Sequence, residues 1–397
     1  MPSDYVKNIS FIFSISIMAI LGIVSVTPSL PYIAKDLNVT ADKIGLVVSF
    51  FALPGIFFTP VYGVLADKYG RKKVLIPSLL IFGIFGTAGF FVRDFNLLLL
   101  FRFISGTGAA SLGALNVALI GDLFPGEMRQ RVVGYNNSAL NFGTTIVPIA
   151  GGMLAKIHWN YVFLLPVLAI VLALFIMFSF KEPVSANRKS VSYFREFVSA
   201  VKNYKILIVF LVNVLMYIIH FGSLWTYIPF LIEKKFLSSS VINGLVLAGM
   251  SLTASFISIF FGKISKKMNP GRIFVYSFVL TSAALFTITL ISEWYYLFIP
   301  MVMFGAGFGM ILPNIQSLVI SLSPENQRGV LVSLNRTISL LGQFLGPVIS
   351  GFILYLFGAG ISSIYMLFYF YSGVCLITLG VSQFAFISKK DKSINEN

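Results

Sequence analysis

Side chains that could carry a proton are scarce in the long apolar stretches of this chain. All 14 Asp and Glu residues lie in polar segments or at the edges of apolar ones. His220 is the only histidine near the middle of an apolar stretch, and histidine changes charge between about pH 5 and 8. His220 is therefore the first candidate for a proton step, helped by Asp36 or Glu233 at the edges of two apolar stretches. The alternatives are a histidine that only packs between helices and one that only hydrogen-bonds substrate while ions play no part.

Other polar residues inside apolar stretches could bind a substrate. Asn213 and Tyr217 precede His220 by seven and three residues, which places all three on one side of a helix. Arg102 is costly within a membrane span, so it either bonds carbonyls of neighbouring helices or acts on a nearby acid. The remaining candidates could line a cavity or join helices by hydrogen bonds; they are Asn116, Asn137, Asn141, Asn314 and Gln343.

Catalytic and metal-binding patterns are absent from the sequence. There is no P-loop and no plausible Ser-His-Asp arrangement, and His158 and His220 are not in a metal-binding spacing. The single Cys375 cannot form an internal disulfide or a cysteine metal site. The sequence therefore predicts neither an enzyme nor a protein with a metal or cofactor.

The elements that must position these side chains are apolar helices. Of the residues, 57% are hydrophobic and 11% are charged, against about 25% charged in soluble domains. Apolar runs of about 20 residues predict transmembrane helices. Twelve such runs lie near 9–31, 44–66, 74–92, 97–121, 132–155, 160–180, 206–232, 241–262, 272–291, 295–321, 330–355 and 361–387. We predict an all-α membrane protein with bundles 1–180 and 206–397 and a cytoplasmic linker 181–205.

An internal repeat relates the two predicted bundles. At a constant offset of 199 residues, Gly106 aligns with Gly305, Gly108 with Gly307, and other glycines and prolines with their own kind. These residues set backbone bends and close helix contacts. Two related bundles in one apolar chain are typical of transporters.

The charge distribution predicts how the chain crosses the membrane. The net charge is +15, and most of the 29 Lys and Arg fall in segments that are cytoplasmic if both termini are cytoplasmic. This is the positive-inside pattern of a multi-pass membrane protein. It accounts for the basic charge without nucleic acid as a partner.

The loop between the second and third spans carries the most specific motif. It runs from Gly63 through Asp67 and Gly70 to Arg71, and it resembles the signature loop of the major facilitator superfamily at every defining position. The resemblance implies a conformational latch. In it Asp67 pairs with the start of the eleventh span, where Arg336 lies, and Arg71 pairs with Asp122.

Further motifs resemble the twelve-span drug–proton antiporter branch of the same superfamily. They lie in spans one, four, five and eleven, and the fifth-span motif departs from the family by placing Val147, not glycine, before its proline. The residues concerned are Pro28, Pro31, Arg102, Gly106, Gly108, Gly143, Pro148, Gly151, Gly152, Gly346 and Pro347.

The resemblance implies a secondary transporter in the cell membrane. It would export small hydrophobic or amphiphilic compounds, drugs or a metabolite, by alternating access in exchange for protons, and it would act as a monomer. One alternative is a facilitator or symporter for a small polar nutrient. The other is a membrane sensor or scaffold that keeps the fold without transport.

Overall fold

The chain folds almost entirely into helices. The computed structural model describes residues 3–124, 126–180, 203–324 and 327–386, and among these residues there is no strand. Twelve helical segments of this part of the chain are long and apolar enough to cross a membrane. The predicted all-α membrane fold is thereby confirmed. The predicted linker 181–205 lies outside the described residues except for 203–205.

The helices form two compact units. The first unit comprises Met1–Val191 with Ser239–Leu245, and the second comprises Ser192–Ser238 with Val246–Asn397. The assignment of Ser239–Leu245 to the first unit has no counterpart in the sequence-based prediction. The predicted limits of the two bundles, at 180 and 206, stay predictions.

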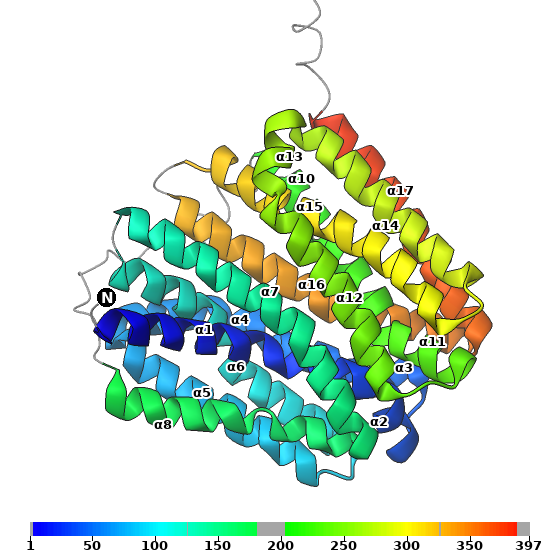
Figure 1. Ribbon diagram of the computed structural model, residues 1–397, viewed down its shortest axis with the longest axis horizontal. Helices are drawn as coiled ribbons and strands as arrows, with labels where there is room; N and C mark the ends of the chain where they lie inside the picture. Colours follow the sequence, from blue (N-terminus) through cyan, green and yellow to red (C-terminus); the bar gives the residue numbers. More distant parts are fainter. Residues whose placement is uncertain (1–2, 125, 181–202, 325–326, 387–397) are drawn as a thin grey trace, which may run out of the picture. The chain divides into compact units, whose positions relative to one another are not determined.

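In the first unit, α6 is the central helix and packs on α1, α4 and α5, while α7 packs on α1 and α8 on α5 (Figure 1). In chain order its elements are α1 (Ser3–Val24), η1 (Thr27–Ser29), α2 (Leu30–Asp36), α3 (Ala41–Ile44), α4 (Leu46–Tyr69), α5 (Arg71–Ala88), η2 (Gly89–Phe91), α6 (Phe95–Leu123), α7 (Gly126–Ile157), η3 (Trp159–Leu164) and α8 (Val167–Ser179).

In the second unit, α14 packs on α15 and α17, and α10 packs on α15, α16 and α17. Its elements are α10 (Tyr204–Ile219), the π-helical turn η4 (His220–Trp225), α11 (Thr226–Phe236), α12 (Ser240–Ile259), α13 (Phe261–Lys267), α14 (Pro270–Leu290), η5 (Trp294–Leu297), α15 (Phe298–Leu322), α16 (Arg328–Phe357) and α17 (Ile361–Phe386). The first residues of α12 belong to the first unit.

The same glycine contacts recur in both units, as the repeat predicts. A Cβ on Gly106 would lie 2.3 Å from the Phe51 carbonyl oxygen, and one on Gly305 would lie 2.4 Å from the Met250 carbonyl oxygen. Phe51 and Met250 are themselves 199 residues apart. Only glycine allows these helices to approach so closely. Each half therefore contains the same close helix contact at the equivalent position of the repeat.

The first span is interrupted at its prolines. Pro28 and Pro31 lack the N–H groups that would continue the helical ladder, and the chain forms the short 3₁₀ turn η1 there. The Ser29 hydroxyl donates to the Val26 carbonyl at 2.6 Å and the Thr27 hydroxyl to the Val24 carbonyl at 3.2 Å. The Val26 carbonyl also accepts from the Ser29 backbone N–H. The Thr27 hydroxyl supplies a partner for the Val24 carbonyl, which lacks the N–H of Pro28 in an apolar surrounding.

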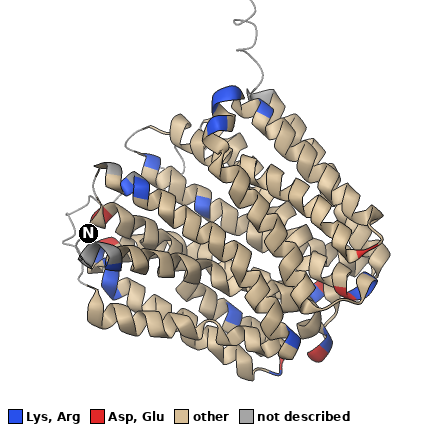
Figure 2. Cartoon of the chain, viewed as in Figure 1, with Lys and Arg blue, Asp and Glu red and all other residues tan. Residues whose placement is uncertain are grey.

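Charged residues gather near the ends of the helices, and the long middle parts carry few (Figure 2). Among the described residues, the buried charged side chains are Arg71 and Arg102. This distribution follows from the cost of placing a charge in hydrocarbon. It leaves two cations whose burial needs a physical explanation.

Candidate functional site

Arg71 is buried between two carboxylates at the Gly70 turn. Its Nη2 lies 2.7 Å from Oδ1 of Asp67, and its Nε lies 3.0 Å from Oδ2 of Asp122. Gly70 has a φ of +101°, which favours glycine and lets α5 begin directly after α4. The predicted pair of Arg71 and Asp122 is thus present, and it joins α5 to α6.

The two carboxylates differ in their exposure. The Asp67 side chain is 43% exposed and that of Asp122 is 13% exposed. Asp67 therefore keeps contact with solvent beside its ion pair, whereas Asp122 compensates the buried charge of Arg71. The predicted pairing of Asp67 with the start of α16, near Arg336, would join the two units and stays a prediction.

Lys72 ties the same turn to α8. Its Nζ donates to the carbonyl oxygens of Met177 and Phe180 at 2.8 Å each. A cation at the carboxyl end of a helix is stabilised by the helix dipole. Gly63, the first residue of the motif, lies one turn before Asp67 in α4. The turn therefore fixes the ends of α4, α5, α6 and α8 together.

Arg102 is buried, and it forms no ion pair with any described residue. Its Nε donates to the Val47 carbonyl at 2.9 Å, and its guanidinium carbon lies 4.2 Å from the centre of the Phe51 ring. Nη2 is buried with no hydrogen-bond partner among the described residues. No described carboxylate lies within ion-pair distance of it. Of the two predicted roles, the structure shows the contact with a neighbouring helix, which is α4.

The motif glycines behind Arg102 let α6 approach its neighbours. Gly106 faces the Phe51 carbonyl of α4, and a Cβ on Gly108 would lie 2.4 Å from the Ser78 carbonyl oxygen of α5. Any side chain at either position would meet backbone, which cannot move aside cheaply. The motif therefore fixes where α6 holds its arginine.

A polar cluster joins α1, α6 and α7 inside the first unit. The Ser16 hydroxyl donates to Oδ1 of Asn136 at 2.5 Å, and Nδ2 of Asn116 donates to the Ile12 carbonyl at 3.1 Å. Asn116 also bonds Ser16 and Asn136. Its Oδ1 is buried without a partner in the described structure. The predicted candidate Asn116 is therefore a contact between helices.

A second polar cluster joins α10 to α16 in the other unit. Nδ2 of Asn213 lies 2.9 Å from Oδ1 of Asn335, 3.0 Å from the Asn335 carbonyl oxygen and 3.0 Å from Oγ of Ser339. Asn335 follows Asn136 by 199 residues. The sequence reasoning missed both residues, although the repeat offset could have identified them. It named Asn137, which is exposed, and Asn141, which is half-buried.

His220 lies in a π-helical turn and is enclosed by aromatic rings. Its Nε2 accepts a hydrogen bond from Nε1 of Trp225, and its Nδ1 is buried without a partner in the described residues. The imidazole stacks on Phe308 with ring centres 4.0 Å apart and planes 8° apart. Tyr217 stacks on Phe221 beside it. Tyr217 and His220 therefore share one aromatic cluster, and Asn213 belongs to the polar cluster instead.

The π turn is held by α16 and α17. The Ser350 hydroxyl donates to the Gly222 carbonyl at 2.7 Å and lies 2.7 Å from the Tyr371 hydroxyl. The Tyr371 hydroxyl donates to the Gly346 carbonyl at 3.2 Å. A Cβ on Gly346, which precedes Pro347, would lie 2.7 Å from the Ile218 carbonyl oxygen. The Gly-Pro motif of α16 thus allows close contact with the turn that carries His220.

The glycine motif of α7 makes equally close contacts. A Cβ on Gly151 would lie 2.1 Å from the Ser25 carbonyl oxygen, and one on Gly152 would lie 2.4 Å from the Ser240 carbonyl oxygen. A Cβ on Gly143 would lie 2.7 Å from Cδ1 of Ile20.

Hydrogen bonds accompany these contacts. The Ser240 hydroxyl donates to the Gly152 carbonyl at 2.8 Å, and Nδ2 of Asn243 donates to the Pro28 carbonyl at 2.9 Å. A Cβ on Gly244 would lie 2.4 Å from the Pro148 carbonyl oxygen. The motifs of spans one and five therefore meet the segment Ser239–Leu245 within the first unit.

The structure also places the remaining predicted candidates. Asp36 accepts a hydrogen bond from Nε1 of Trp159 at 2.6 Å, and Glu233 is half-buried in α11. Nδ2 of Asn314 donates to the Pro270 carbonyl at 3.1 Å. Gln343 is buried in α16.

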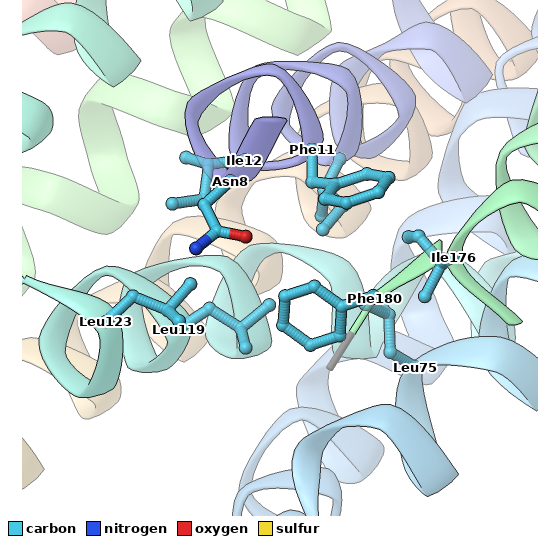
Figure 3. A pocket seen from close by; sticks show the side chains of 9 residues that line it. Asn8, Phe11, Ile12, Leu75, Leu119, Leu123, Ile176 and Phe180 are labelled. Atoms are coloured by element: carbon cyan, nitrogen blue, oxygen red, sulfur yellow. The ribbon is translucent and has the colours of Figure 1, made fainter. Parts of the chain in front are cut away.

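An apolar hollow too narrow to hold a water molecule lies between α1, α5, α6 and α8 (Figure 3). Phe11, Leu119 and Phe180 line it, and Asn8 is its only polar side chain. Without converging polar groups it is not a convincing substrate site. No group of His, Cys, Asp and Glu in the described part of the chain could hold a metal ion.

Comparisons with known proteins connect these features to transport. The family model described as Major Facilitator Superfamily matches residues 12–292 and 214–396. The bacillibactin exporter of Bacillus subtilis strain 168 is 27% identical over 410 residues, which cover 97% of this chain and 98% of that protein. The quinolone resistance protein NorA of Staphylococcus aureus strain COL is 26% identical over 351 residues, which cover 87% of this chain and 89% of that protein.

A solved structure shares the fold. The nucleoside transporter NupG superposes with a TM-score of 0.82 at 14% sequence identity, and the match covers 96% of this chain and 100% of that one.

Proposed function

This chain belongs to the Major Facilitator Superfamily, and we propose that it exports small hydrophobic or amphiphilic compounds by alternating access in exchange for protons. The observation that carries the proposal is the similarity to an exporter along nearly the whole length of both chains. A quinolone resistance protein is similar over most of the chain as well. The compounds exported would be drugs or a metabolite.

The geometry of the first unit supports a working transporter. At the Gly70 turn, Gly70 has a positive φ, and the buried Arg71 is paired with both carboxylates, Asp67 and Asp122. Arg71 joins α5 to α6 through Asp122, and Asp67 stays half-exposed. The Asp67 carboxylate is therefore suited to form and break a further contact as the protein changes conformation. A scaffold that does not transport would have no need of that arrangement.

The alternative of a polar-nutrient transporter has weaker support. The nucleoside transporter shares the fold at 14% identity, which says nothing about substrate. In the second unit the rings of Tyr217, Phe221, Phe304 and Phe308 pack together, and an aromatic interior suits apolar ligands.

The charge pattern supports the membrane placement. Lys68, Lys72 and Lys73 lie at the Gly70 turn together with Arg71, and an excess of basic residues marks cytoplasmic loops. We place this turn and both termini in the cytoplasm and the protein in the cell membrane, where it would act as a monomer.

Accumulation in everted membrane vesicles tests the proposed direction of transport. Vesicles from a host without its own drug pumps are energised to an acidic interior, and a panel of neutral, anionic and cationic aromatic compounds is offered outside. We expect uptake of at least one compound that stops when an ionophore collapses the pH gradient. Vesicles without the protein are the control. Uptake that is insensitive to the ionophore would contradict proton exchange, and no uptake of any compound would contradict the exporter.

A further inference from the structure

The second unit contains a buried hydrogen-bond donor that has no acceptor among the described residues. The indole N–H of Trp225 can only donate, and it donates to Nε2 of His220. The proton of the neutral imidazole must therefore lie on Nδ1. His220 is 5% exposed, and its Nδ1 has no partner among the described residues. Since buried donors are nearly always paired, an unpaired one suggests an acceptor that is not part of the chain.

Aromatic rings surround this donor. The ring centre of His220 lies 4.0 Å from that of Phe308, 5.4 Å from that of Phe221 and 5.5 Å from that of Phe304. Phe304 and Phe221 are buried, whereas Phe308 and Tyr217 are half-buried. The planes of His220 and Phe308 are 8° apart. Phe308 thus covers one face of the imidazole.

Hydrogen bonds from α16 and α17 hold the backbone around His220 in place. Ser350 and Tyr371 bond the carbonyls of Gly222 and Gly346, and a Cβ on Gly222 would lie 2.2 Å from the Tyr371 hydroxyl oxygen. π-Helical turns inside α-helices frequently mark functional sites. The turn is therefore a rigid support for His220.

The lack of buried charge in the second unit restricts the ligand. No Asp, Glu, Lys or Arg is among the buried side chains of the described part of that unit. An aromatic face can hold a cation, but a permanent cation offers no acceptor to the donor on His220 and finds no counter-charge in this interior. A ligand with an acceptor oxygen would instead satisfy the donor on His220.

We propose that His220 Nδ1–H, together with Tyr217, Phe221 and Phe308, forms a subsite for a planar aromatic compound that carries an acceptor oxygen and is neutral or anionic. This inference rests on the proposed export function, since it names the substrate class. It assigns His220 a direct contact with substrate, separate from any proton step.

Ring-matched probes test the proposal by direct binding to the purified full-length protein. Naphthoate, naphthamide and trimethylnaphthylammonium share one ring system and differ in the attached group. We expect the first two to bind about tenfold more tightly than the cation, because the buried donor is then satisfied. Equal or tighter binding of the cation would overturn the proposal.

Substitutions at His220 distinguish the contribution of its N–H donor from that of its ring. An Asn side chain places its N–H₂ near the position of Nδ1, whereas Gln reaches toward Nε2 and Phe has no polar group. We expect His220→Asn to keep the preference for naphthoate over the cation, and His220→Gln and His220→Phe to lose it. If His220→Phe does not fold, the Asn and Gln variants still decide the question. A preference unchanged in all three variants would remove His220 from the subsite.

Failure of the subsite and failure of the proposed function give different results. Vesicle uptake that persists in His220→Phe with unaltered selectivity would refute the subsite and leave export intact. Selective binding by the wild-type protein, with no uptake of any compound into vesicles, would support the subsite and refute export.

Discussion

A buried cation in this chain lies either beside carboxylates or against a carbonyl and an aromatic face. Arg71 has the first arrangement, with Asp67 and Asp122, and Arg102 has the second, with Val47 and Phe51. Removing one partner of a buried pair strands a charge and costs about 3–5 kcal/mol, whereas an exposed pair contributes little. The two carboxylates around Arg71 should therefore differ in what they do.

Substituting each carboxylate in turn distinguishes a role in the conformational latch from a role in helix packing. Asp67→Asn should abolish transport and leave the amount of folded protein unchanged, because Asp122 still compensates Arg71. Asp122→Asn should lower the thermal stability, because it leaves a buried guanidinium with a half-exposed partner. Expression, thermal unfolding in detergent and vesicle uptake measure these effects, with the exposed Lys73→Gln as control. Normal turnover in Asp67→Asn would refute the latch.

Asn136 and Asn137 form a matched pair for the polar cluster of the first unit. Asn136 is buried and bonded to Ser16 and Asn116, whereas Asn137 is exposed. Asn136→Leu should cost about 1 kcal/mol, the scale of a hydrogen bond between helices in a membrane, and Asn137→Leu should cost nothing measurable. Thermal unfolding of both variants decides this. Equal midpoints would mean that the cluster contributes no stability.

The proton step predicted for His220 concerns the other ring nitrogen. A proton that arrives at Nε2 must displace the Trp225 hydrogen bond, so the charge of His220 and the bonding of the π turn would change together. Initial transport rates between about pH 5.5 and 8.5 should depend on pH in the wild type and lose part of that dependence in His220→Gln. Full activity with an unchanged pH profile would exclude His220 from the proton step and leave Asp36 and Glu233 as its candidates.

At the scale of the elements, composition predicts the helices and the repeat predicts their contacts. The twelve spans follow from apolar runs of sufficient length, and the aligned pairs Gly106 with Gly305 and Gly108 with Gly307 meet backbone in both units. The π turn at His220 was not predicted, because no residue pattern distinguishes it from an α-helix. Asn136 was missed in favour of Asn137, since adjacent positions on a helix cannot be assigned to a face without the neighbouring helices.

The close contacts of α7 predict a graded effect along one helix. A side chain at Gly152 meets the Ser240 carbonyl, whereas a Cβ at Gly134 has nothing within 4 Å. Gly152→Leu should therefore impair transport or uncouple it from the proton gradient, and Gly134→Leu should behave like the wild type. Vesicle uptake and proton leak measured in parallel check both. Equal activity of the two variants would show that the fifth-span motif has no role in sealing the transporter.

At the scale of the whole molecule, the two units share their glycine contacts and differ in their charged groups. The first unit holds both buried arginines, and the second holds the buried histidine. The signature loop keeps its acid only in the first unit, since Gly262 is followed by basic residues and no Asp. An exporter built in this way would latch mainly through the first unit and recognise substrate through the second.

Proton movement triggered by substrate tests the claim of proton-coupled export most directly. Everted vesicles are acidified inside, and an exported compound is added to the outer medium while a fluorescent dye reports the internal pH. We predict that the interior becomes more alkaline when substrate enters, and that vesicles carrying Asp67→Asn show no such change. Substrate accumulation without any change of internal pH would contradict the account.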